Sequence, residues 1–261
     1  MFEIQYVVIG LVQGITEFLP ISSSGHLVLI SKISNWNDQG LFTDIAVHGG
    51  TLIAVLVYLR REIIKILYNF FQKKLFNEII IYKIIFDRLP AVIVGFFVFN
   101  FFDDYLRNLK VVAWASIIFG VLLYFADKKN TSKPIWNEIN FKDALIIGIF
   151  QVLAFIPGAS RAGLTITGAR FLGFERTNAA IFSMLLSIPI ILASLTLSIF
   201  DVISDPINNT FVLQSLFAAI VACITALLSI HFMMKLIQKT NFNLFIIYRI
   251  ILGIILLFFY A

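Results

Sequence analysis

The sequence predicts an all-α integral membrane protein with six transmembrane helices and two re-entrant helical hairpins in an inverted repeat, within a single membrane domain. The chain of 261 residues is 60% hydrophobic and only 13% charged, with a mean hydropathy of +0.94. Soluble domains carry about 25% charged residues. Six apolar segments have lengths near that of a bilayer-spanning helix, and two shorter apolar pairs are each broken by a proline and polar residues.

The first short pair lies at the start of the chain. Residues 4–19 are apolar but would extend only about 24 Å as a helix, which is short of a hydrocarbon core of about 30 Å. Pro20 disfavours helical geometry at Leu19 and should end this helix. The next apolar run, from 27 to about 33, is shorter still. The pair predicts a re-entrant hairpin with residues 20–26 at its tip, here called the first tip.

Between and after the two short pairs lie six longer apolar segments and one amphipathic segment. Residues 60–83 alternate apolar with basic residues at helical intervals, which predicts an amphipathic helix on the membrane surface. In the last segment, Arg249 is expected to bond to backbone or to a buried acid. The six segments predicted to span the membrane are 41–59, 84–102, 111–126, 178–200, 211–233 and 244–260.

A second short apolar pair, 141–156 and 164–173, surrounds the sequence PGASRAGLT of residues 157–165, here called the second tip. Residues 155–160 (FIPGAS) echo residues 18–23 (FLPISS) as Phe-x-Pro-x-x-Ser. Each copy precedes three predicted spans, which indicates an internal repeat.

The repeats cover about 1-126 and 141-261. Three crossings are an odd number, so the second repeat enters from the opposite side and the two tips can meet near the midplane. One face carries thirteen Lys and Arg residues, whereas the other carries only Lys32, Arg107 and Lys110. This bias predicts that the basic face is cytoplasmic and that both termini lie outside. The first Lys or Arg is Lys32, so no signal peptide is expected.

Composition also excludes several classes of site. Cys223 is the single cysteine, which excludes an intrachain disulfide and any cysteine-rich metal site. The net charge of +5 is modest, and no stripe of basic and aromatic residues indicates nucleic acid as a partner. Asp44 and His48 are four residues apart on the first predicted span, and their pairing is interpreted as structural.

Polar and ionisable side chains gather at and just before the first tip. Gln13 and Glu17 are four residues apart, so they share one face of a helix. Ionisable groups at membrane depth are costly and tend to be functional, although a paired structural charge and a serine N-cap are the alternatives. The tip then offers hydroxyls, a flexible backbone position and an imidazole, from Ser22, Ser23, Ser24, Gly25 and His26.

The second tip adds a cation. Arg161 can bind phosphate oxygens bidentately, or it can pair with Glu17 and brace the two hairpins. Combined, the tips favour phosphoryl transfer over acyl transfer. A divalent cation, Mg²⁺ or Ca²⁺, would be held by Glu17 with help from Gln13. The residues expected to approach phosphate include Gly158, Ser160, Gly163 and Thr165 of the second tip, with Ser22 and Ser24 of the first.

Three blocks, residues 13–26 (QGITEFLPISSSGH), 157–165 (PGASRAGLT) and 182–189 (FSMLLSIP), resemble the undecaprenyl-diphosphatase family, the bacitracin-resistance proteins. The resemblance covers essentially the whole chain. It implies hydrolysis of undecaprenyl diphosphate to undecaprenyl phosphate and inorganic phosphate. It also implies a divalent-cation requirement, a site opening to the outer face of the bacterial inner membrane, and a role in cell-wall synthesis.

The family's functional residues fall on matching positions. Its glutamate-rich block maps onto Gln13 and Glu17, its serine and histidine onto Ser23 and His26, and its arginine onto Arg161. Gln13 leaves one carboxylate where some members have two. The favoured mechanism has Ser23 attacking with His26 as base, and His26 as the nucleophile stays open. The expected partners are a polyprenyl diphosphate lipid and the bilayer, and a homodimer also stays open.

Two rival interpretations remain. The inverted repeat also suits a lipid-phosphate flippase or transporter, because fold does not fix function. A phosphatase of the phosphatidic-acid type would use elements like Ser24-Gly25-His26 and Ser160-Arg161. However, no histidine follows Arg161 at short range, and the Lys-and-Arg-Pro element upstream is missing.

Overall fold

The protein is almost entirely helical in the part of the chain that the computed structural model describes. It describes residues 3–34, 36, 40–71, 82–84, 87, 90–91, 94, 108–129, 133–134, 139–204 and 209–260. These ranges contain no strand, only an isolated bridge between Lys133 and Phe174. Most of the predicted span 84–102, and the second half of the predicted surface helix 60–83, fall outside the described residues.

The helices follow the apolar pattern of the sequence. In chain order they are α1 (Ile4–Thr16), α2 (Ser23–Ser34), α3 (Gly40–Tyr58), α4 (Arg60–Phe71), α8 (Leu109–Asp127), α10 (Phe141–Val152), the short 3-10 turn η1 (Leu153–Phe155), α11 (Arg161–Phe171), α12 (Arg176–Ser204), α13 (Asn209–Lys239) and α14 (Asn243–Tyr260). Each predicted short pair is thus two helices separated by a break at its tip.

Three described helices are long and apolar enough to cross a membrane, namely Leu109–Asp127, Arg176–Thr196 within α12 and Phe211–Lys239 within α13. The pair Phe42–Tyr58 and Arg60–Tyr68 is a fourth candidate, bent by 72°. α1 and α14 are apolar but shorter. The protein is therefore a multi-pass membrane protein by the composition of its helices.

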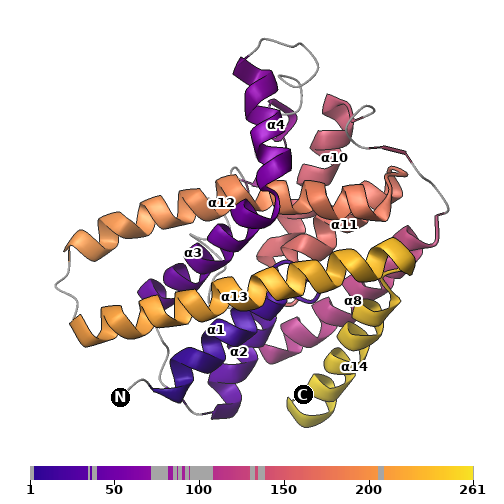
Figure 1. Ribbon diagram of the computed structural model, residues 1–261. Helices are drawn as coiled ribbons and strands as arrows, with labels where there is room; N and C mark the ends of the chain where they lie inside the picture. Colours follow the sequence, from indigo (N-terminus) through magenta and orange to yellow (C-terminus); the bar gives the residue numbers. More distant parts are fainter. Residues whose placement is uncertain are drawn as a thin grey trace.

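Small residues allow the helices around α1 to approach closely. α13 packs along both α1 and α3, and α14 packs along α8 (Figure 1). A Cβ atom added at Gly10 or Gly14 of α1, or at Gly50 of α3, would collide with backbone or side-chain atoms of α13. Such small-residue contacts are typical of helix packing in membranes, where close approach of backbones supplies the attraction.

The two tips lie inside this bundle. Leu19 and Ile21 are buried and belong to the largest apolar cluster, together with Phe182 of α12 and Ile246 of α14. Ala159 of the second tip is completely buried. Both chain ends lie on the lower side of Figure 1, whereas α4 and α10 project from the upper side. Broken backbone is tolerated at membrane depth when it is buried in protein in this way.

Candidate active site

The first tip turns the chain sharply between α1 and α2. Glu17 still has helical backbone angles and its N–H bonds to the carbonyl of Gln13, so the two side chains share one face as predicted. Ser22 then adopts φ of 75°, a left-handed conformation that is unusual for a residue other than glycine. Its Oγ accepts a hydrogen bond of 3.3 Å from the N–H of Gly25 and thereby caps α2.

The second tip repeats this cap. Ser160 has φ of 70°, and its Oγ accepts a hydrogen bond of 3.1 Å from the N–H of Gly163. Strained serines thus precede both α2 and α11, and the sequence Ser-x-x-Gly recurs in the same structural role. The Phe-x-Pro-x-x-Ser echo aligns Ser23 with Ser160, but the caps align Ser22 with Ser160. The second tip has one more residue after its proline.

The corrected alignment has a chemical consequence. The first helical residue after each cap is Ser23 in α2 and Arg161 in α11, so the two repeats present a hydroxyl and a guanidinium from equivalent positions. The tips also touch directly, because a Cβ atom on Gly25 would lie 3.3 Å from Cα of Gly158.

Glu17 joins these two side chains. Its Oε2 accepts hydrogen bonds from Ser23 Oγ at 2.7 Å and from Gln13 Nε2 at 2.9 Å. Its Oε1 accepts one from Arg161 Nη2 at 2.6 Å. Glu17 is only 7% exposed, so these contacts are poorly screened by water. The predicted residues Gln13, Glu17, Ser23 and Arg161 therefore form one connected group.

A cavity of about 190 Å³ opens beside this group. Most of its lining is polar, and the remainder comes from apolar residues of η1 and α12. Its walls are Glu17, Ser22, Ser23, Ser24, His48, Ala154, Ser160, Arg161, Ile190, Ile191 and Ser194. A cavity that combines a cation, several hydroxyls and an apolar wall suits an anionic head group attached to a hydrocarbon chain.

His26 faces a different partner from the one predicted. Its Nδ1 lies 2.6 Å from the carbonyl oxygen of Ser22, and its Nε2 lies 2.6 Å from the hydroxyl of Tyr248 on α14. The two rings are nearly parallel, at 8°. His26 is absent from the cavity lining, and Ser23 bonds to Glu17 instead. The geometry does not pair His26 with Ser23 as base and nucleophile.

His48 is the histidine that lines the cavity. Its Nε2 lies 3.8 Å from Oε2 of Glu17, and its Nδ1 lies 2.6 Å from the backbone carbonyl of Asp44. The spacing of Asp44 and His48 predicted a structural pair and did not reveal the place of His48 beside Glu17. Ser194 was missed as well. Their positions depend on how α3 and α12 pack against the tips, which local spacing does not reveal.

The other predicted phosphate-binding residues divide into two groups. Ser22, Ser24 and Ser160 line the cavity. Thr165 does not, because it is buried and its Oγ1 lies 2.6 Å from Ser183 Oγ. The two glycines of the second tip, Gly158 and Gly163, are also absent from the lining, and Gly158 has φ of 90°.

The donor set at Glu17 suits a hard cation. Glu17 offers carboxylate oxygens, and Oε1 of Gln13 is buried without a hydrogen-bond partner in the described part of the chain. Serine hydroxyls lie beside them. Mg²⁺ and Ca²⁺ prefer such oxygen ligands. The described residues contain no group of three or more His, Cys, Asp or Glu side chains that could hold a metal ion. Among the residues that line the cavity, Glu17 is the one carboxylate.

Comparison with known proteins identifies the family of the chain. Residues 6–255 match the family described as bacitracin resistance protein BacA. The chain belongs to the BacA family. It is similar to the undecaprenyl-diphosphatases of Campylobacter curvus, at 42% identity over 99% of both chains, and of Aliivibrio salmonicida, at 44% identity over 95% of both chains. That of Campylobacter concisus is 42% identical over 98% of both chains.

Membership of the BacA family confirms the resemblance found in the sequence. The match extends over both tips and all the helices between them. The residues that form the connected group at Glu17 all lie within the matched range.

Proposed function

We propose that this protein hydrolyses undecaprenyl diphosphate to undecaprenyl phosphate and inorganic phosphate, which recycles the lipid carrier of cell-wall synthesis. The observation that carries the proposal is the bridge from Ser23 through Glu17 to Arg161 beside a cavity with an apolar wall. Relatives at 42–44% identity over nearly the full chain are named undecaprenyl-diphosphatase.

The reaction begins at Ser23. Its Oγ attacks the terminal phosphorus, the phosphoanhydride bond breaks, and undecaprenyl phosphate leaves. The hydroxyl proton passes to Oε2 of Glu17, which already accepts the Ser23 hydrogen bond at 2.7 Å. A water molecule then attacks the phosphorus of the phosphoserine, the bond from phosphorus to Oγ breaks, and inorganic phosphate leaves. The proton held by Glu17 returns to Ser23 Oγ, which regenerates both side chains. Splitting the reaction in this way replaces one difficult step with two easier ones.

Arg161 stabilises the charge that moves during both steps. Its Nη2 holds Oε1 of Glu17, whereas its Nη1 is buried and has no hydrogen-bond partner among the described residues. That second nitrogen can donate to a phosphoryl oxygen while the first still fixes the carboxylate. Preorganised donors of this kind act most strongly in a site that excludes water.

A divalent cation bound by Glu17 and Oε1 of Gln13 would neutralise charge on the diphosphate. In the same proposal His26 holds the Ser22 carbonyl, and through it the turn that presents Ser23. The mechanism predicted from the sequence, in which His26 is the base for Ser23, stays a prediction, and so does its alternative, in which His26 is the nucleophile. So does the homodimer.

We also propose the finer membrane architecture, namely six spans and two re-entrant hairpins in inverted repeats of about 1-126 and 141-261. The matching caps at Ser22 and Ser160 support it. With those caps aligned, Gly10 and Gln13 of α1 fall on Gly148 and Gln151 of α10. Together with the caps, these residues extend the match from Gly10 to Gly25, which is a longer stretch than the proline echo.

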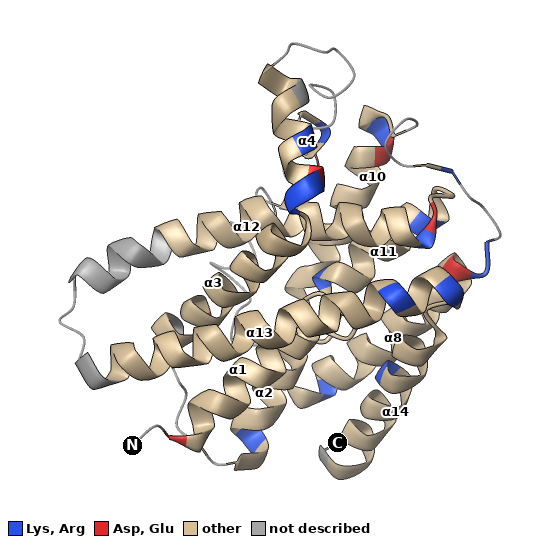
Figure 2. Cartoon of the chain, in the orientation of Figure 1, with Lys and Arg blue, Asp and Glu red and all other residues tan. Residues whose placement is uncertain are grey.

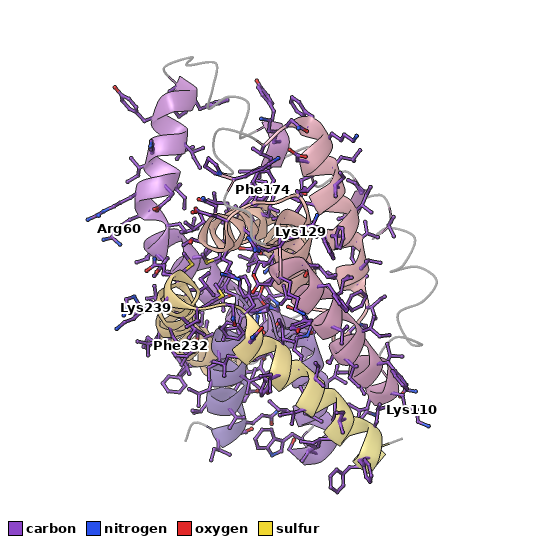
Figure 3. All side chains as sticks on the ribbon, turned by 90° about the vertical axis from the view of Figure 1, so that its right-hand side faces the viewer. Arg60, Lys110, Lys129, Phe174, Phe232 and Lys239 are labelled. Carbon is purple, nitrogen blue, oxygen red and sulfur yellow. The ribbon has the colours of Figure 1, made fainter. Side chains whose placement is uncertain are left out.

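The orientation is part of this proposal. Lys and Arg gather on α4 and at the upper and right-hand helix ends of Figure 2, and few lie on the lower side. In Figure 3, Lys110 lies at the lower end, whereas Arg60, Lys129 and Lys239 lie higher. We therefore propose the bacterial inner membrane, with both termini and the cavity on the outer side.

Phosphate release by the purified protein tests the proposed reaction. In detergent, the protein should release one phosphate per undecaprenyl diphosphate and leave undecaprenyl phosphate as the lipid product. Chelation of divalent cations should lower the rate, and added Mg²⁺ or Ca²⁺ should restore it. A protein that transfers labelled lipid between the leaflets of a vesicle but releases no phosphate would instead be a flippase. Nothing in the site or the relatives favours that alternative.

A further inference from the structure

Arg249 is a buried cation that the proposed reaction does not use. It lies in α14, is 0% exposed, and has no carboxylate among its described hydrogen-bond partners. Burying a charge is costly unless hydrogen bonds compensate for the lost water. A charge kept at this depth must therefore be stabilised by the groups that surround it.

Those groups are backbone carbonyls of both tips. Arg249 Nη1 donates to Pro20 of the first tip at 3.4 Å. Arg249 Nη2 donates to Gly158 at 3.0 Å and to Ala159 at 2.8 Å in the second tip, and approaches Ala115 of α8 at 3.4 Å. The planar fork of arginine can reach several acceptors at once, which a lysine ammonium on its flexible stem cannot do with the same geometry.

The neighbouring residue strengthens the link. Tyr248 bonds to His26 at the other end of the first tip. Gly163 of α11 lies so close to the guanidinium that a Cβ atom there would be 2.8 Å from Arg249 Nη1. Two consecutive residues of α14 thus contact the tips, Tyr248 the first tip and Arg249 both.

We propose that Arg249 is a positioning residue that sets the two tips at the separation required for Ser23 and Arg161 to meet Glu17. The inference rests on the proposed function, because it concerns the geometry of that reaction. The tip carbonyls that Arg249 holds lie three residues before Ser23, and two and three residues before Arg161. A shift of about 1 Å between reacting groups can cost about 100-fold in rate.

Arg170 provides a matched control. It is also a buried arginine, 2% exposed, and donates to the backbone carbonyls of Phe174 and Lys129. It pairs with Asp127 at 3.2 Å, and these three partners lie outside the two tips. Replacing either arginine by lysine removes a buried fork of hydrogen bonds, but only Arg249→Lys should disturb the relation between the tips.

The first test separates kcat from KM for folded, monodisperse protein. Arg249→Lys should lower kcat by about tenfold to 100-fold with KM changed by less than about threefold. Arg170→Lys should lower thermal stability and leave kcat of the folded fraction unchanged. In an Arg161→Lys background, Arg249→Lys should lower kcat by a much smaller factor. The guanidinium of Arg161, which Arg249→Lys would misplace, is already absent there. A wild-type kcat for Arg249→Lys, or full additivity with Arg161→Lys, would overturn the proposal.

The second test does not depend on the substrate. Spin labels at Lys32→Cys, at the end of α2, and Phe155→Cys, just before the second tip, report the distance between the tips in a Cys223→Ser background. Arg249→Lys should shift or broaden this distance distribution, and Arg170→Lys should not. An unchanged distribution would refute the positioning role even if the wild type proved inactive on undecaprenyl diphosphate. If Arg249→Lys and Arg249→Gln both fail to fold, Arg249 is a stability residue and the proposal is rejected.

Discussion

The Nη2 atom of Arg161 lies 2.6 Å from Oε1 of Glu17, and this contact joins the second tip to the end of α1. The sequence left two roles open for Arg161, a brace between the hairpins and a ligand for phosphate. The Nη1 atom has no hydrogen-bond partner among the described residues, which makes the roles compatible, because one nitrogen can hold the carboxylate while the other contacts substrate.

Arg161→Lys distinguishes these roles. Lysine keeps the charge and the ion pair but loses the second nitrogen, so we expect normal expression and thermal stability with a 100- to 1,000-fold lower turnover. This loss corresponds to roughly 3–4 kcal/mol of transition-state stabilisation. The measurements are phosphate release and thermal unfolding in detergent. Near wild-type turnover for Arg161→Lys, combined with an unstable Arg161→Ala, would leave Arg161 as a brace only.

Tyr248→Phe tests the role of His26 in the reaction. The substitution removes only the hydroxyl that lies 2.6 Å from Nε2 of His26. A hydrogen bond of this kind contributes about 1 kcal/mol net, so we expect kcat to fall by less than about tenfold. His26→Asn should retain more activity than Ser23→Ala if His26 holds the Ser22 turn. Equal and complete loss in His26→Asn and Ser23→Ala would favour His26 as the base or nucleophile.

Gln13→Glu tests the cation site. A second carboxylate beside Glu17 should bind a divalent cation more tightly, so less Mg²⁺ or Ca²⁺ should be needed for half-maximal activity. The cation should also raise the thermal unfolding temperature of this variant more than that of the wild type. Gln151→Glu, the matching amide in α10, serves as the control. If the cation requirement is the same in Gln13→Glu and Glu17→Gln, the carboxylate acts elsewhere.

Two exposed lysines test the orientation. Lys32 ends α2, and Lys239 ends α13 on the more basic face. In a Cys223→Ser background, an impermeant thiol reagent added to intact spheroplasts should label Lys32→Cys and spare Lys239→Cys. Both should react after the membrane is opened. The reverse pattern would invert the proposed topology.

Much of this site follows from local sequence. The spacing of Gln13 and Glu17 on one helix face, the break after Glu17, and the serine caps can all be predicted from helix geometry and from proline chemistry. The contact between Glu17 and Arg161 was one of two roles predicted for Arg161. This prediction depended on recognising that the two hairpins are repeats.

The remainder depends on packing between distant segments. His48 reaches Glu17 because α3 and α1 both pack on α13 through small residues, and Tyr248 reaches His26 because α14 packs on α8 beside the tips. The proline echo misaligned Ser23 with Ser160 because one extra residue in the second tip is visible only when the backbone conformations are compared.

The most direct test of the account is phosphate release from undecaprenyl diphosphate by the wild type, Ser23→Ala and Ser31→Ala in parallel. Ser31 lies on the same helix, and within the described part of the chain its hydroxyl donates to the carbonyl of Leu27 alone, so it controls for loss of a hydroxyl from α2. The account predicts that wild type and Ser31→Ala release one phosphate per lipid, and that folded Ser23→Ala loses about 1,000-fold or more of the rate. Wild-type turnover by Ser23→Ala would contradict the assignment of the active site.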